Sequence, residues 1–222
     1  MTDSHGRPFK LSWDYDRAEL VADAIVHGIG LALGIAGTVV LIAFAARSRG
    51  IGDLPIVAVY AAGLLAMLGF SAAYNLWPVS RIKWVLRRFD HSAIYLLIAA
   101  TYTPFVTRVA NAWLAFGLLA GVWAVAVAGI AMKLALPGRF DRISILLYLL
   151  LGWSGLLMYQ PVIASLPGWT LWLLAAGGLL YSIGVVFHVW ESLRFQNAIW
   201  HGFVVLAAGC HYTAVLGALG MA

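Results

Sequence analysis

Charged residues are scarce in this sequence. Only 10% of its 222 residues are charged and 63% are hydrophobic, whereas soluble domains carry roughly 25% charged residues. The mean hydropathy is +0.92. A chain of this composition cannot cover itself with polar surface, so we expect it to lie in a lipid bilayer. The composition excludes a cytosolic enzyme, a secreted disulfide scaffold and a disordered regulator.

Cysteine is nearly absent as well. The single cysteine, Cys210, excludes an intrachain disulfide. No phosphate-binding glycine loop, nucleophile elbow, haem motif or dinucleotide fingerprint occurs. The net charge of +5 is typical of basic cytoplasmic loops in a membrane protein. The expected partners are membrane lipids and a lipid or small-molecule ligand, and no nucleic acid; the sequence does not indicate an oligomeric state.

Seven apolar runs predict an all-α integral membrane protein, with residues 1–222 forming one seven-helix bundle. A helix needs about 20 apolar residues to cross the hydrocarbon core, whereas barrel strands are about 10 residues long and alternate. A short polar tail, about residues 1–18, precedes the first run and lacks a cleavage site, so we expect the first span to be retained. The predicted spans are Val21–Ala46, Ile56–Leu76, Ser92–Val109, Trp113–Leu136, Ile143–Ile163, Trp169–Val189 and Ile199–Leu219.

The distribution of basic residues predicts the orientation. With the N-terminus in the cytoplasm, 11 of the 14 lysines and arginines fall in cytoplasmic segments. The positive-inside rule therefore places the N-terminus inside and, after seven spans, the C-terminus outside. We expect a multi-pass protein of a bacterial cell membrane, that is, an inner membrane.

Polar residues that interrupt the spans gather at one end. Ionisable groups within a membrane are costly and are functional candidates by default. Apart from the adjacent pair Asp90 and His91, those on one helix are spaced four or eight apart, so they share a helix face. The sequence predicts a polar pocket in the inner half of the bundle, open toward the cytoplasm. The candidate residues are Glu19, Asp23, His27, Ser71, Asn75, Asp90, His91, Asn197 and His201.

Each candidate also has a structural interpretation. Glu19 and Asp23 could complement the positive end of the first helix, and Asp90 could cap the third. Ser71 could bond the carbonyl four residues before it. The histidines could be neutral packing groups. The gathering of all these groups at one end favours a site, with Asn75 and Asp90 converging on His201.

Three stretches of the sequence resemble a known family. They are Glu-Leu-Val-Ala-Asp-Ala-Ile-Val-His-Gly-Ile-Gly at 19–30, Ser-Ala-Ala-Tyr-Asn-Leu-Trp-Pro with Arg-Phe-Asp-His-Ser-Ala-Ile-Tyr and Thr-Tyr-Thr-Pro between 71 and 104, and Asn-Ala-Ile-Trp-His-Gly-Phe-Val at 197–204. The chain resembles the bacterial hemolysin III proteins, within the wider progestin and adipoQ receptor (adiponectin-receptor-like) family. That resemblance implies a seven-helix bundle with a cytoplasmic-side zinc site and zinc-dependent hydrolysis of lipid amides or esters.

The sequence departs from the family's zinc pattern at two positions. Ser71, Asp90 and His201 match it, and the resemblance implies catalytic roles for the first two and zinc ligation for the third. Asn75 and Asn197 stand where the pattern has histidine. An amide oxygen is a poor neutral ligand for zinc. We therefore expect a weak or absent zinc site. The alternative is a rearranged site that recruits His27 or His91.

Three functions follow from these observations. The first is non-catalytic sensing or binding of a lipid or small molecule, or an effect on membrane state, which the substituted site favours. The second is a metal-dependent hydrolase of lipid amides or esters, which needs at least three good ligands. The third is a pore-forming haemolysin, which would want polar groups along the full depth of the membrane.

The orientation is directly testable. A reporter fused after Ala222 should read as outside the cytoplasm, and one inserted in the 77–90 segment should read as cytoplasmic, because 11 of 14 basic residues lie on that side. Paired alkaline phosphatase and fluorescent-protein fusions at both points would measure this. The reverse pattern would put the polar pocket on the opposite face of the membrane.

Overall fold

The computed structural model describes residues 15–48, 50–158 and 164–220. Within these ranges the chain forms seven α-helices and no strand, which confirms the predicted all-α membrane fold. The predicted tail lies largely outside the described residues, as does the end of the fifth predicted span. The helical segments are α1 (Arg17–Ser48), η1 (Gly50–Asp53), α2 (Leu54–Leu76), α3 (Arg81–Val106), α4 (Ala112–Ala135), α5 (Asp141–Trp153), η2 (Ser154–Met158), α7 (Gly168–Val189) and α8 (Gln196–Ala218).

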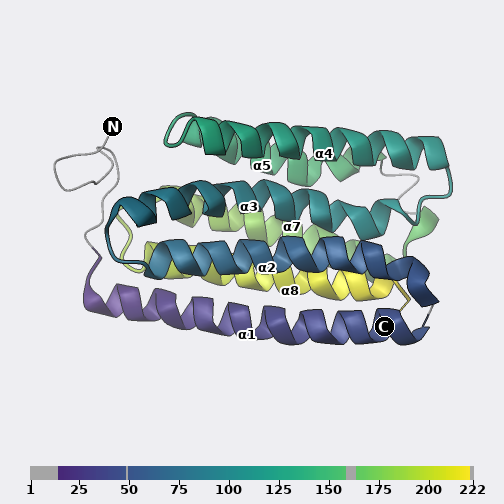
Figure 1. Ribbon diagram of the computed structural model, residues 1–222, viewed down its shortest axis with the longest axis horizontal. Helices are drawn as coiled ribbons and strands as arrows, with labels where there is room; N and C mark the ends of the chain where they lie inside the picture. Colours follow the sequence, from purple (N-terminus) through teal and green to yellow (C-terminus); the bar gives the residue numbers. More distant parts are fainter. Residues whose placement is uncertain (1–14, 49, 159–163, 221–222) are drawn as a thin grey trace.

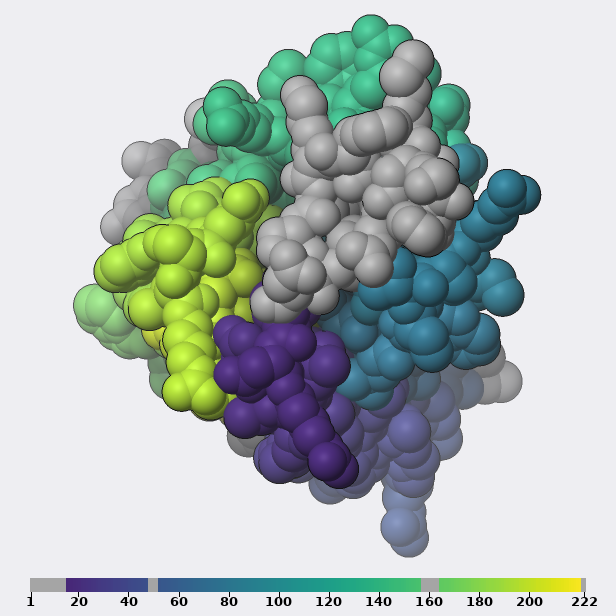
Figure 2. Space-filling model, turned by 90° about the vertical axis from the view of Figure 1, so that its left-hand side faces the viewer, coloured from purple at the N-terminus to yellow at the C-terminus, as the bar shows by residue number. Residues whose placement is uncertain are grey.

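The helices run up and down in a bundle with short connections (Figure 1). Helix α1 lies along one edge and α4 and α5 lie along the opposite edge. Helix α1 packs against both α2 and α8, so the first and last helices are neighbours. Helices α1, α3, α5 and α8 all begin at the left-hand end of Figure 1, which we call the inner end; Figure 2 looks onto it. The prediction places this end in the cytoplasm.

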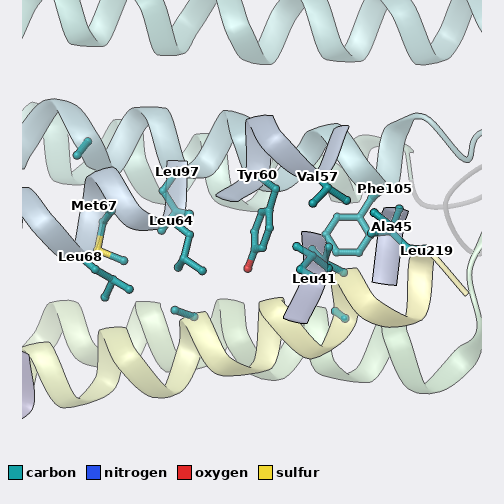
Figure 3. Close-up of a cluster of buried hydrophobic side chains, with 14 of the residues drawn as sticks. Leu41, Ala45, Val57, Tyr60, Leu64, Met67, Leu68, Leu97, Phe105 and Leu219 are labelled. Carbon is teal, nitrogen blue, oxygen red and sulfur yellow. The ribbon is translucent and has the colours of Figure 1, made fainter. Parts of the chain in front are cut away.

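The apolar core lies between α1, α2, α3 and α8. Leu41, Tyr60, Leu64 and Leu97 are all buried in it (Figure 3). Helices α2 and α3 approach closely at Gly63, where an added Cβ would lie 2.5 Å from the Cβ of Ala100. Small residues at helix crossings favour association within lipid, where burial of apolar surface gives no driving force.

Five of the described helices are long and apolar enough to span a membrane, and α3 and α5 are the exceptions. Helix α3 begins at Arg81, well before the predicted start at Ser92, because Ser80 caps it and accepts a hydrogen bond from the Lys83 backbone N–H. The interpretation of Asp90 as the cap is therefore wrong. Asp90 lies inside the helix, nine residues from its start.

Helix α5 ends at Trp153, so the continuous helix predicted over 143–163 is wrong for the described part. A 3₁₀ turn follows, and the hydroxyl of Tyr102 on α3 lies beside the break. This hydroxyl accepts from the Gly155 N–H at 2.6 Å and lies 3.0 Å and 2.9 Å from the carbonyl oxygens of Leu151 and Gly152. Backbone groups freed in a membrane need such partners.

Three charged side chains meet near the inner ends of α3, α4 and α5. Asp141 accepts from Arg87 at 2.8 Å and from Lys133 at 2.7 Å. The side chains of Arg87 and Lys133 are only 7% and 2% exposed, so one carboxylate compensates two buried cations. This cluster ties α3 and α4 to the start of α5.

The change Asp141→Asn should destabilise the protein strongly, because it leaves both cations without a counter-charge. Breaking a buried ion pair costs about 3–5 kcal/mol, and we expect the lower end since the Asp141 side chain is 34% exposed. Thermal unfolding in detergent would measure the effect. The neighbouring exposed residue gives a matched control, Arg142→Gln, expected to change stability by less than about 0.5 kcal/mol. Equal melting temperatures for Asp141→Asn and the wild type would contradict the role of the cluster.

Candidate functional site

A buried hydrogen bond joins α1 to α8 at the inner end of the bundle. The carboxylate Oδ1 of Asp23 lies 2.6 Å from Nδ1 of His201. One turn further along α1, Nδ1 of His27 lies 2.8 Å from the backbone carbonyl oxygen of Asp23. The two imidazole rings are 4.3 Å apart, edge to face. Carboxylate and carbonyl oxygens only accept, so both histidines carry hydrogen on Nδ1 and present the Nε2 lone pair to α2.

Helix α2 supplies the groups that face these two Nε2 atoms. Ser71 Oγ lies 3.3 Å from Nε2 of His27, and Asn75 Nδ2 lies 3.5 Å from Nε2 of His201. The Asn75 amide also donates to the Ser71 carbonyl oxygen at 2.9 Å. The spacing of four residues between Ser71 and Asn75 puts both on the face of α2 that meets α1 and α8.

Asn197, at the start of α8, closes the network. Its Nδ2 donates to Oδ1 of Asn75 at 3.0 Å and lies 3.4 Å from Oδ2 of Asp23. The two asparagines therefore bond to each other, and both also contact the Asp23–His201 pair. The result is a polar network of neutral amides around one carboxylate and two imidazoles.

Two further predicted residues lie on α3, beside this network. Asp90 lies close enough to Ser71 and His201 to interact with both electrostatically, and its side chain is 14% exposed. His91 lies 4.0 Å from the Asp90 carboxylate and 4.0 Å from that of Asp141. His91 therefore faces the charged cluster at the start of α5, whereas Asp90 faces the network.

Glu19 lies at the entrance and caps two helices. Its Oε2 accepts from the Asp16 N–H at 2.9 Å while Asp16 Oδ1 accepts from the Glu19 N–H at 2.9 Å, which is a capping box. The bond from the Glu19 N–H lowers the pKa of Asp16 below its ordinary value. The other oxygen of Glu19 accepts from the N–H of Phe195, the residue before α8, at 2.9 Å. Glu19 therefore lies in the first turn of α1, where a carboxylate complements the positive end of the helix.

The sequence analysis missed a lysine at this site. Lys83 is 7% exposed, and its Nζ donates to the backbone carbonyl oxygens of Asn75 and Trp77, at 2.9 Å each. In the sequence, Lys83 lies between the second and third predicted spans and counts among the basic residues of a predicted cytoplasmic segment. Its spacing of four residues from Arg87 was the signal that both share one helix face, since α3 starts before them. Lys83 satisfies the last carbonyls of α2.

A large cavity of about 1250 Å³ opens beside the network. Its walls come from α1, α2, α3, α5, α7 and α8, and all nine predicted candidates except His27 line it. On α3 it is lined by Lys83, Arg87, Asp90, His91, Ile94, Leu97, Ile98, Thr101 and Tyr102. The fifteen residue steps from Arg87 to Tyr102 correspond to about 22 Å along the helix axis, a large part of the roughly 30 Å hydrocarbon thickness.

The cavity is polar at the inner end and apolar beyond it. Past the network, the walls include Leu97, Ile98, Leu149 and Val204. The few polar groups at this depth are bonded to the protein itself. The Thr101 hydroxyl donates to the Leu97 carbonyl, and His211 contacts the Leu174 carbonyl at 3.3 Å. The cavity therefore has a polar head region and a long apolar channel.

At the three positions where the resemblance implies zinc ligands, His201 is the one imidazole. Asn75 and Asn197 bond to each other. A different set, Asp23, His27 and His201, does bring candidate ligand atoms within 4.8 Å of one another. Ligands of one tetrahedral zinc lie about 3.4 Å apart, given bonds of about 2.0–2.1 Å. The 2.6 Å between Asp23 and His201 is a charge-assisted hydrogen bond.

Comparison with known proteins places the chain in a family. It matches the family described as haemolysin-III related over residues 18–212. It is 38% identical to the hemolysin-3 homolog of Bacillus subtilis over 198 residues, covering 89% of this chain and 93% of that protein. It is 37% identical to hemolysin-3 of Bacillus cereus, covering 89% and 90%.

A more distant relative is human. The chain is 32% identical over 163 residues to the monocyte to macrophage differentiation factor of Homo sapiens, covering 71% of this chain and 67% of that protein. No solved structure matches the chain. The family match spans the helices that build the bundle and every residue of the polar network. The chain is therefore a multi-pass membrane protein that belongs to the haemolysin-III-related family.

Proposed function

We propose that this protein binds a lipid or a lipid-like small molecule in the inner-end cavity and responds to its presence, without metal chemistry. The observation that carries the proposal is the continuity of the polar network with an apolar channel in one cavity, which extends about 22 Å from Arg87 to Tyr102. A small polar solute needs no such channel, whereas an acyl chain fills one. The volume, about 1250 Å³, lies above the roughly 300–1,000 Å³ of drug-sized pockets.

The network supports recognition of a head group that accepts hydrogen bonds. Two of its contacts are long: 3.5 Å between Asn75 Nδ2 and His201 Nε2, and 3.4 Å between Asn197 Nδ2 and Asp23 Oδ2. Good N–H donors lie about 2.7–3.2 Å from their acceptors. These amide hydrogens are therefore weakly used within the protein, and a ligand carbonyl, ester or hydroxyl oxygen can compete for them.

Filling the channel should abolish ligand binding. Val185 on α7 lines the cavity, whereas Val186, the next residue, is 56% exposed on the outer surface. The change Val185→Trp should raise the Kd of a dansylated long-chain fatty acid by at least about tenfold, or about 1.4 kcal/mol. The matched control, Val186→Trp, should leave it within about twofold. Fluorescence titration of purified protein in detergent measures both. Equal weakening by the two variants, or no binding by the wild type, would overturn the proposal.

The metal-free character of the site has its own test. The wild type should hold much less than one zinc per chain, since His201 is the one imidazole at the three family positions. The double change Asn75→His with Asn197→His supplies two more imidazoles at side chains that already contact each other. It should bind about one zinc and gain thermal stability from the bound ion, whereas each single change should bind far less.

Elemental analysis and melting temperatures, with and without chelator, would compare these four proteins. Stoichiometric zinc in the wild type would show that Asp23, His27 and His201 rearrange to hold it, and would favour the metal-dependent hydrolase instead. If the double variant takes up no zinc, the inner ends of α2 and α8 are too far from the family's geometry to hold the ion.

A further inference from the structure

Charged side chains are unevenly distributed around the inner end of the cavity. Among the described residues, the wall formed by α3 and α5 carries three cations and two carboxylates, a net charge of +1. They are Lys83, Arg87, Asp90, Asp141 and Arg142. The wall formed by the start of α1 and the segment between α7 and α8 carries four carboxylates and two arginines, a net charge of −2. They are Asp16, Arg17, Glu19, Asp23, Glu191 and Arg194. The two walls therefore carry opposite net charges.

Two tyrosines connect the basic wall with the acidic wall. Tyr74 on α2 lies close enough to Arg87 and to Tyr15 to interact with both electrostatically. Tyr15 in turn interacts with the carboxylates of Glu19 and Glu191. Both tyrosines line the cavity. The cations and the carboxylates therefore lie near the same two phenols at the inner end of one cavity, and a single ligand head group can reach both.

The buried guanidinium of Arg87 has a donor that the described residues leave unused. Its side chain is only 7% exposed and lines the cavity. Nη2 donates to Asp141 at 2.8 Å, whereas Nε is buried and has no hydrogen-bond partner among the described residues. A phosphate matches the fork geometry of arginine, because its oxygens accept from two N–H groups of one guanidinium at once. A phosphate at this wall would supply the acceptor that Arg87 lacks.

Each wall also offers an exposed charge. Arg142 on α5 and Glu191 after α7 are both exposed and line the cavity, and neither forms an ion pair with another described residue. The exposed pair of Asp16 and Arg194 differs, since its atoms lie 3.0 Å apart and its charges compensate each other. Arg142 and Glu191 are therefore the charges most accessible to a ligand on the basic and the acidic wall.

We propose that the ligand of this cavity is a phospholipid with a zwitterionic head group, which carries one phosphate and one primary ammonium. The phosphate contacts Arg87 and Arg142, the ammonium contacts Glu191, and an acyl chain lies in the apolar channel. An anionic head group would leave the acidic wall without a partner, and a neutral one would match neither wall. The inference rests on the proposed function, because the chain must first enter the cavity.

Competition against the dansylated fatty acid in a non-ionic detergent tests the inference. Three competitors carry the same palmitoyl chain: lysophosphatidylethanolamine, lysophosphatidylglycerol without the ammonium, and monopalmitoylglycerol without either charge. The first should bind at least about tenfold more tightly than monopalmitoylglycerol, the size of a hydrogen bond to a charged group. It should bind about threefold more tightly than lysophosphatidylglycerol, the size of an exposed ion pair. Free phosphoethanolamine should not compete at these concentrations, since it has no chain.

Single charge changes separate the contributions of the two walls. Arg142→Gln should weaken both phosphate lipids about threefold and leave monopalmitoylglycerol unchanged. Arg139→Gln is the matched control, because Arg139 is exposed but does not line the cavity, and it should leave all three lipids unchanged. Glu191→Gln should weaken lysophosphatidylethanolamine about threefold without weakening lysophosphatidylglycerol. Inhibition constants are corrected for the Kd of the dansylated probe, and melting temperatures check that each variant is folded.

The other outcomes contradict the inference in distinguishable ways. Equal binding of the three lipids, while the dansylated fatty acid still binds, would reject head-group recognition and leave the proposed binding function standing. Equal binding of the two phosphate lipids, with no effect of Glu191→Gln, would show an anion site only. Equal weakening by Arg139→Gln and Arg142→Gln would assign the effect to the protein's overall charge. Competition by free phosphoethanolamine as strong as by its lysolipid would reject a lipid ligand. No binding of the dansylated fatty acid by the wild type would reject the proposed function itself.

Discussion

The hydrogen bond between Asp23 and His201 holds together the two ends of the fold. It spans 178 residues of sequence, links α1 to α8, and is only 2.6 Å long. Within a bilayer an unpaired carboxylate or imidazole finds no water, so each must be satisfied by the protein. The positions of Ser71 and Asn75 on α2 and Asn197 on α8 follow from that requirement, since each contacts Asp23 or one of the two histidines directly. The same side chains therefore join the first helix to the last and form the candidate site.

The same requirement explains how the bundle tolerates asparagine at the family's histidine positions. An amide offers a donor and an acceptor, so Asn75 and Asn197 satisfy each other while each keeps a second donor contact. The strongest of these amide contacts is the 3.0 Å bond between the two asparagines. The polar network also provides what a lipid carbonyl needs, which is N–H groups aimed into a largely apolar cavity. The proposed ligand binding depends on these groups.

The sequence predicted those features that depend on one helix at a time. Apolar run lengths indicated the seven helices, and the four-residue spacings of Ser71 with Asn75 and of Asn197 with His201 indicated shared faces. The sequence did not predict features that depend on contacts between different helices. In the sequence, Arg87 and Lys133 have the appearance of loop charges, but in the structure both are buried and paired with Asp141. The end of α5 likewise depends on a contact with Tyr102, which belongs to another helix. The tautomer of His27, and hence the direction of the Ser71 hydroxyl, depends on a backbone carbonyl that no residue pattern specifies.

The two oxygens of Glu19 have a consequence beyond capping. One accepts from Asp16, the residue that precedes α1, and the other from Phe195, the residue that precedes α8, so a single carboxylate sets the axial register of the two helices. Asp23 lies four residues beyond Glu19 and His201 six beyond Phe195, which are rises of about 6 and 9 Å. A slip of one turn, about 5.4 Å, would separate the pair completely. The geometry of the buried site is therefore fixed by a charge in the first turn of α1, at the inner end of the bundle.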